Sequence, residues 1–158
     1  MGAFHTQLLD LVGYTDYAAT FADPARQLMA VEPFSYVVDA NAANITQTVQ
    51  QTFDTPMLDD ADFVMVSTSQ FARPAGATNL TANPAVLIQI IDLSSGRAFF
   101  AGPSPLPMVA GQGGFNFILP GPKTIKARAT LRTTAISCQA QTFNGFYMAF
   151  HGARLWYR

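Results

Sequence analysis

Apolar and polar positions alternate along most of the chain with the two-residue period of β-strands. The alternation is clearest in residues 123–132. One face of this segment is apolar and the other is polar: Ile125, Ala127, Ala129 and Leu131 against Lys126, Arg128, Thr130 and Arg132. Residues 85–92 form a nearly continuous apolar run, which is typical of a strand covered on both faces. The pattern predicts an all-β body with a basic stripe on one strand face.

Turn residues divide residues 33–158 into about eight short strands. The predicted strands and short apolar runs cover residues 34–39, 45–53, 63–71, 85–92, 97–100, 115–119, 123–132, 135–143 and 146–156. Residues 102–114 are rich in proline and glycine, so an irregular loop is expected there. This spacing predicts a mostly β fold, a single antiparallel β-sandwich, with the jelly roll as one candidate topology.

The strongest turn signal is Asn144-Gly145, which lies between two apolar runs. This dipeptide is typical of a two-residue hairpin. We therefore expect the strands on either side to pair, with Cys138 opposite His151. The last strand is apolar on both faces and is expected to be central in its sheet.

The first 32 residues differ from the rest. They contain segments that could form one or two short helices, with Asp23 as the cap and Pro24 as the first residue of the second. An extended arm with brief helical turns is the alternative. The predicted organisation is an N-terminal arm over residues 1–32 and a β-sandwich body over residues 33–158. We expect the arm to be protease-sensitive until a partner orders it.

The composition is unusually neutral. Of the 158 residues, 49% are apolar and only 12% are charged, about half the common share of ~25%. The chain also contains 13 phenylalanines. Such a surface favours a subunit covered by partners over a free enzyme.

Charge is distributed unevenly along the chain although the net charge is −1. Residues 1–92 hold ten acidic and two basic residues, a net −8, whereas residues 93–158 hold seven basic and no acidic residues, a net +7. Either the two parts neutralise each other in the fold, or the subunit is polar and suited to head-to-tail packing. No nucleic-acid partner is predicted, because the net charge of −1 gives no basic surface overall. No membrane partner is predicted, because no apolar run reaches the ~20 residues of a membrane span. The N-terminus lacks a secretory signal, so we expect a soluble protein that is made inside the cell.

Candidate chemistry is sparse. Four carboxylates lie close together in sequence and offer ligands for a hard cation such as calcium, or a solvated turn: Asp54, Asp59, Asp60 and Asp62. Their spacing matches no EF-hand loop, and this alternative stays open.

Two further features are candidates for catalytic or cofactor sites. Cys138 and His151 could form a nucleophile–base pair, but no surrounding residues form a catalytic elbow. A lone cysteine also excludes an internal disulfide and a cysteine-based zinc site. The glycine-rich residues 111–114 match neither a P-loop nor a dinucleotide fingerprint. We therefore predict no catalytic, cofactor-binding or metal-binding residues, and a protein that is not an enzyme.

The order of several short motifs resembles that of small β-sandwich virion proteins of tailed bacteriophages. These motifs are Pro33-Phe34-Ser35-Tyr36, Asp62-Phe63, Ile91-Asp92, Ser95-Gly96-Arg97, Leu119-Pro120-Gly121-Pro122 and Phe150-His151-Gly152. The resemblance implies a capsid cement or decoration protein without a cofactor. It would clamp neighbouring copies of the major capsid protein, associate with copies of itself, often as a trimer, and reside in the virion after assembly in the bacterial host cytoplasm.

Two alternatives follow from the same residues. The first is a head-to-tail connector or a tail or baseplate accessory subunit. The second is a carbohydrate-binding or receptor-binding β-sandwich, which would need an exposed aromatic platform. Trp156 and Tyr157 are the adjacent aromatic residues that could supply one.

Overall fold

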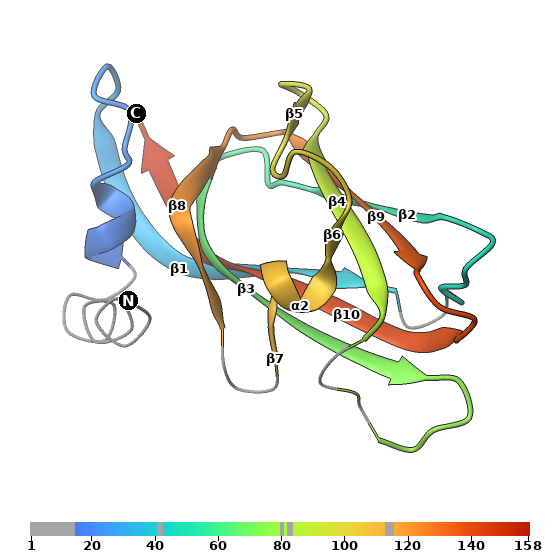
Figure 1. Ribbon diagram of the computed structural model, residues 1–158. Helices are drawn as coiled ribbons and strands as arrows, with labels where there is room; N and C mark the ends of the chain where they lie inside the picture. Colours follow the sequence, from blue (N-terminus) through green and yellow to red (C-terminus); the bar gives the residue numbers. More distant parts are fainter. Residues whose placement is uncertain (1–14, 41–42, 80, 82–83, 113–115) are drawn as a thin grey trace.

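The chain folds into two β-sheets that pack face to face (Figure 1). A computed structural model describes residues 15–40, 43–79, 81, 84–112 and 116–158. Sheet A contains β1 (Leu28–Asp39), β10 (Phe143–Tyr157), β3 (Asp62–Pro74), β8 (Phe117–Ile125) and β7 (Gly111–Gln112). Sheet B contains β2 (Gln51–Pro56), β9 (Thr130–Ser137), β4 (Val86–Asp92), β5 (Arg97–Ala98) and β6 (Ser104–Pro105). A four-residue helix, α2 (Leu106–Val109), connects β6 to β7.

The strand order is that of a jelly roll. Sheet A runs β1-β10-β3-β8 and sheet B runs β2-β9-β4, with β5 and β6 along the far edge of β4. These pairs are antiparallel, and only the short β7 is parallel to β3. Successive long strands alternate between the sheets, so that the first and last strands lie side by side in sheet A. The predicted antiparallel β-sandwich is confirmed.

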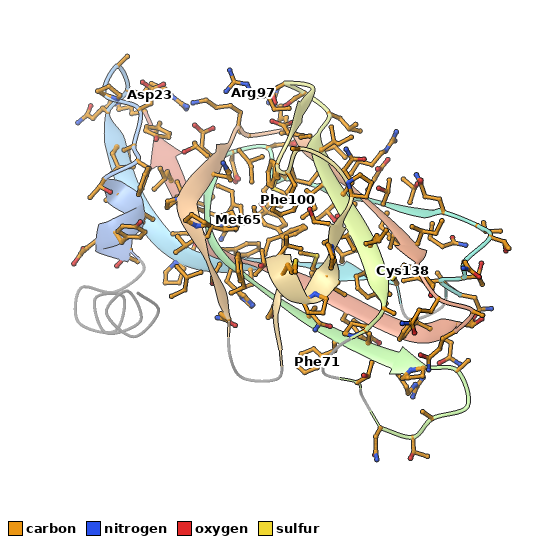
Figure 2. The ribbon with its side chains drawn as sticks, in the orientation of Figure 1. Asp23, Met65, Phe71, Arg97, Phe100 and Cys138 are labelled. Atoms are coloured by element: carbon orange, nitrogen blue, oxygen red, sulfur yellow. The ribbon has the colours of Figure 1, made fainter. Side chains whose placement is uncertain are left out.

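The core lies between the sheets and is built from aromatic, aliphatic and methionine side chains. Its largest fully buried members are Phe63, Phe143, Phe146, Phe150, Ile45, Met65, Ile88, Ile90, Leu106, Ile125, Leu131 and Met148. Strands β4 and β9 alternate strictly between buried and half-buried residues, as expected for strands with one face on the core. Met65 and Phe100 point into the space between the sheets (Figure 2).

The predicted hairpin at Asn144-Gly145 is wrong. Strand β10 runs through both residues, and the chain turns over residues 138–142 instead. Strands β9 and β10 belong to different sheets, so Cys138 does not face His151. The Cα partners of His151 are Ser35 on β1 and Ser67 on β3.

Two β-bulges lie beside the glycines of β10. The pairing with β3 shifts register between Phe143 and Gly145 and again between His151 and Gly152. At the first shift the extra residue is Asn144 on β10, so that Phe143 and Phe146 both face the core. At the second shift the extra residue is Val66 on β3, opposite the step from His151 to Gly152. At Gly152 a Cβ atom would lie 1.9 Å from the carbonyl oxygen of Val64, so the close approach of β3 requires glycine.

The predicted strand over residues 123–132 is also interrupted. Strand β8 ends at Ile125 in sheet A, and β9 begins at Thr130 in sheet B. Lys126 and Arg128 lie in the connection, where Arg128 adopts a left-handed conformation with φ of 65°. The basic stripe is therefore not formed, and the polar–apolar alternation here spans a crossover between sheets.

Other boundaries differ from the predictions as well. The predicted loop over residues 102–114 contains β6, α2 and β7. The predicted strand over residues 45–53 begins only at Gln51, although Ile45 forms an isolated bridge with Phe143.

The N-terminal segment forms a third layer on the outside of sheet A. Residues 15–19 are helical, and β1 begins at Leu28, within the range predicted as an arm. Tyr17, Ala18 and Phe21 pack against the outer side chains of β3 and β10, and residues 1–14 of the predicted arm lie outside the described residues. Asp23 accepts a hydrogen bond from the Ala25 amide at 3.0 Å, but a turn follows it rather than the expected helix. Within the described ranges, no helix has the length and apolar character needed to cross a bilayer.

Candidate interaction surface

One end of the sandwich carries no charged residue in its connections. At this end the chain passes from β1 to β2, from β3 to β4, from β6 to β8 and from β9 to β10. The described residues of these connections are 40, 43–50, 75–79, 81, 84–85, 106–112, 116 and 138–142, and none of them is Asp, Glu, Lys or Arg. The nearest charged positions in sequence are Asp39 and Arg73. We call these connections the uncharged end.

The uncharged end also exposes apolar side chains. Val49 is 53% exposed and Met108 is 69% exposed. Cys138 is exposed in the connection after β9 and lies far along the sandwich from Asp23 and Arg97 (Figure 2). A surface of alanine, amide, hydroxyl and exposed apolar side chains loses little by burial against a partner, because it has no charges to desolvate.

The opposite end, which we call the charged end, holds the N-terminal segment, the connection before β3, the turn after β4 and the connection after β8. Here the acidic and basic parts of the chain meet: Asp62 binds Lys126, and Lys126 also lies 3.7 Å from Asp23. Elsewhere, Asp54 pairs with Arg132 and Glu32 with Arg154. Of the two alternatives for the charge distribution, these pairs support neutralisation within the fold.

Asp62 is the hub of the charged end. Its side chain is only 2% exposed, and it accepts hydrogen bonds from Arg26 at 3.1 Å, Lys126 at 3.0 Å and the Ala127 amide at 2.9 Å. The hydrogen bond to Asp62 raises the pKa of Lys126 above its ordinary 10.5. Arg26 stacks on the ring of Tyr157 at 3.9 Å, so the hub fastens the N-terminal segment to sheet A.

The four clustered aspartates do not form a common site. Asp54 accepts two hydrogen bonds from Arg132, which hold its pKa below the ordinary 3.8, and Asp62 belongs to the hub. Asp59 and Asp60 are exposed in the connection between these two. In the described part of the chain, no group of three His, Cys, Asp or Glu side chains could hold a metal ion.

A cleft of about 670 Å³ opens at the charged end between the β4–β5 turn and β8. Burial acts to raise the pKa of Asp92 in its wall, but hydrogen bonds from Ser94 and Ser95 outweigh this and lower it below 3.8. Arg97 and Lys123 also line the cleft, and neither has an ion-pair partner in the described ranges.

His151 is held between two serines on the outer face of sheet A. Its Nδ1 lies 2.8 Å from Ser35 Oγ and its Nε2 lies 2.7 Å from Ser69 Oγ. Positions 35 and 151 are directly opposite in the ladder between β1 and β10. Ala40 N–H donates to the Phe146 carbonyl, so the hydrogen-bonded pairs involve the even-numbered residues, and 35–151 is a pair without backbone hydrogen bonds. Side chains are closest in such pairs. Burial lowers the pKa of His151 below 6.5, so the ring is neutral at pH 7.

The outer face of sheet A has two halves, divided by the bulge at Val66 of β3, opposite Gly152. The covered half lies under the N-terminal segment and consists of Leu28, Val31, Val64, Val66, Ala153 and Leu155. The open half consists of Ser35, Val37, Ser69, Phe71 and His151. Val37 is 56% exposed and Phe71 is 40% exposed, and Phe71 projects away from the core (Figure 2).

The proposed aromatic platform is not available in the fold. The guanidinium group of Arg154 lies over the Trp156 ring, and that of Arg26 lies over the Tyr157 ring. Both residues are half-buried, and the Tyr157 hydroxyl accepts a hydrogen bond from the Asp23 amide at 2.9 Å. These rings hold the charged end together.

Sequence reasoning missed the Asp62 hub, the uncharged end and the Ser35–His151–Ser69 row. Each joins residues that are distant in sequence, and their proximity follows from the jelly-roll strand order. Residues 40–50, 75–85, 106–116 and 138–142 carry no charge in the sequence, and this signal would have predicted the uncharged end if these connections had been assigned to one end of the sandwich. Of the predicted glycine-rich loop, Gly111 and Gln112 form β7, and residues 113 and 114 lie outside the described residues.

No protein-family model and no curated protein sequence matches the chain. One solved structure that aligns with the fold is described as the crystal structure of dimeric latent PorU from Porphyromonas gingivalis. The alignment covers 82% of this chain and 13% of that chain, with a TM-score of 0.41 and 10% sequence identity. The chain thus spans about one eighth of that protein's length, and a likeness at this level carries no argument about function.

Proposed function

We propose that the protein is a non-enzymatic structural subunit of a bacteriophage particle, of the capsid cement or decoration kind. The uncharged end carries this proposal. Four connections from separate parts of the chain gather at one end and contain no charge, and apolar side chains are exposed among them. A freely diffusing protein usually keeps charge on such loops, whereas a subunit buries them against its neighbours.

The fold agrees with this proposal without deciding it. Jelly rolls occur in viral capsid proteins and also in lectins. In this chain, the aromatic rings that a sugar platform would need are covered by arginines, which makes the lectin alternative weaker. A connector or tail subunit would use the same uncharged end, and the number of copies in a particle separates it from a cement protein.

Attachment should depend mainly on apolar contact. Exposed ion pairs contribute ~0–1 kcal/mol each and are screened by salt. Burial of apolar surface contributes about 25 cal/mol per Å², so a half-apolar patch of about 800 Å² outweighs several such pairs. We expect the protein to remain on particles in molar salt.

The test begins with particles of the phage that encodes the chain. The protein should be present in purified virions, with hundreds of copies for a cement protein and about a dozen or fewer for a connector or tail subunit. Particles without the gene should lose their contents at a lower temperature, and added purified protein should restore their stability. Absence from the particle would overturn the proposal.

A matched set of three variants tests the role of the uncharged end. Ala77→Glu and Ala140→Glu place a carboxylate on exposed positions of two of its connections, whereas Ala98→Glu places one on the exposed β5 at the charged end. The first two should bind deficient particles at least about tenfold more weakly than the third, because each must desolvate a charge on attachment. Equal binding by all three folded variants would count against this surface.

A further inference from the structure

We propose that two copies of the chain associate through the free edges of their β1 strands, in an antiparallel register centred on Val37. The two A sheets would then continue into each other across a twofold axis. This inference does not rest on the proposed virion function, because it concerns the purified protein in solution.

The first observation is that β1 has an open edge. In the described residues, β10 is the strand that pairs with β1, which ends the strand order of sheet A. The Ala40 amide donates to the Phe146 carbonyl. Because hydrogen-bonded pairs alternate along an antiparallel ladder, the backbone N–H and C=O groups of the even-numbered residues of β1 point toward β10. The backbone groups of Ser35, Val37 and Asp39 therefore face away from the sheet.

The second observation is that only part of this edge is protected. Natural edge strands use proline and charged residues to block pairing with another chain. The first part of β1 contains a charged residue, Glu32, and a proline, Pro33. The backbone nitrogen of Pro33 is on the outward side of the strand, where it has no N–H to donate to another chain. The second part exposes Val37, beside a groove of about 250 Å³ between β1 and β2. The accessible edge is thus residues 35–39.

The third observation is that this accessible edge is complementary to itself. In a register centred on Val37, each Val37 lies opposite its own copy, and Ser35 lies opposite Asp39. The outward backbone groups of these residues would exchange about six hydrogen bonds, two for each facing pair. The two exposed valines then cover each other.

Other registers fit less well. When the centre moves to Tyr36 or Ser35, Pro33 of one copy lies opposite Asp39 or Val37 of the other, and the hydrogen bonds that Pro33 cannot donate are lost. The register centred on Val37 avoids this loss. The occupant that best fits the edge is therefore a second copy of the chain, aligned by Pro33 and Val37. Because the contact is small, we expect a dimer that dissociates on dilution.

Cysteine cross-linking tests the register. In a Cys138→Ser background, two Val37→Cys copies would have Cα atoms about 5.5 Å apart, within the range of a disulfide. Mild oxidation should convert this variant to a covalent dimer. The Cα atoms of Ser35→Cys, and likewise those of Asp39→Cys, would lie about 14 Å from their own copies, so neither variant should cross-link alone, whereas an equal mixture of the two should. Cross-linking of Ser35→Cys alone, or failure of both Val37→Cys and the mixture, would overturn the register.

Sedimentation tests the association without a covalent bond. The wild-type protein should show a rise in average mass with concentration, toward a dimer. Val37→Pro removes an outward N–H that the monomer does not use in its sheet, so the variant should fold normally and remain monomeric, while Val37→Thr should still associate. A wild-type protein that stays monomeric at millimolar concentration, or a Val37→Pro variant that associates as the wild type does, would overturn the proposal.

Discussion

The covered and open halves of the outer face of sheet A lie on the same strands, yet they are built for different surroundings. The covered half consists of aliphatic side chains that the N-terminal segment buries. The open half places a histidine between two serines and leaves Val37 and Phe71 partly exposed. The difference teaches that one strand can change its role along its length, because the extra residue Val66 in β3, opposite the step from His151 to Gly152, changes which residues of β3 face outward. Each prediction below tests this division.

The largest effect is expected at the boundary between the halves. In Gly152→Ala the new methyl group would meet the Val64 carbonyl oxygen at 1.9 Å and the Val64 carbonyl carbon at 2.9 Å. Backbone must move to admit it, so we expect a loss of at least about 3 kcal/mol in the free energy of unfolding, measured by chemical denaturation. Gly102→Ala is the matched control, since nothing lies within 4 Å of its Cβ position. Equal stability of the two variants would refute the close approach at the bulge.

The next prediction compares the halves directly. Leu155 is fully buried beneath the N-terminal segment, whereas Phe71 is 40% exposed on the open half. Leu155→Ala should cost about 3 kcal/mol of unfolding free energy through lost burial and a residual cavity. Phe71→Ala removes more atoms but should cost at most about 1 kcal/mol, because its ring is already partly in water. If Phe71→Ala were the more damaging variant, the open half would be part of the core.

A third prediction concerns the Asp62 hub, which holds the N-terminal segment on sheet A. Asp62→Asn keeps the shape of the side chain but removes the charge that binds Arg26 and Lys126. Both cations are substantially exposed and can return to water. We therefore expect a loss of about 2 kcal/mol in the free energy of unfolding, which is less than the loss expected if both cations were left buried without a partner. Trypsin should also cleave after Arg26 faster than in the wild type.

Asp54→Asn provides the control for this variant. Asp54 makes a two-bond contact with Arg132, but both side chains are exposed, so this change should destabilise the fold less and leave cleavage after Arg26 unchanged. An N-terminal segment that is equally protected in Asp62→Asn and the wild type would show that the apolar contacts of Ala18 and its neighbours suffice.

The sequence predicted the sandwich because alternation reports which residues of a strand face the core. Strand β4 was placed to within one residue, since Val86, Ile88 and Ile90 are inward and its ends carry turn residues. The same rule misplaced the crossover at residues 126–129, where alternation continues while the chain passes from one sheet to the other. At Asn144-Gly145 the local turn preference was real, but the core contacts of Phe143 and Phe146 on both sides keep the chain in one strand.

The surfaces were less predictable than the fold. The proximity of Ser35, Ser69 and His151 depends on β10 lying between β1 and β3, and no local pattern encodes that order. The charge separation along the chain was visible, but its outcome depended on which strands became neighbours. Asp54 and Arg132 meet because β2 pairs with β9.

The smallest expected effect is the pH dependence that His151 gives to the open half. Burial lowers its pKa below 6.5, so the unfolded chain takes up this proton more readily than the folded protein. The contribution of the neutral ring is therefore complete above pH 6.5 and is lost as the pH falls through 6.5 toward the lower folded value. In His151→Gln, the difference in unfolding free energy between pH 8 and pH 5 should be smaller than in the wild type. An unchanged pH dependence in His151→Gln would show that the serines accommodate the charged ring as well as the neutral one.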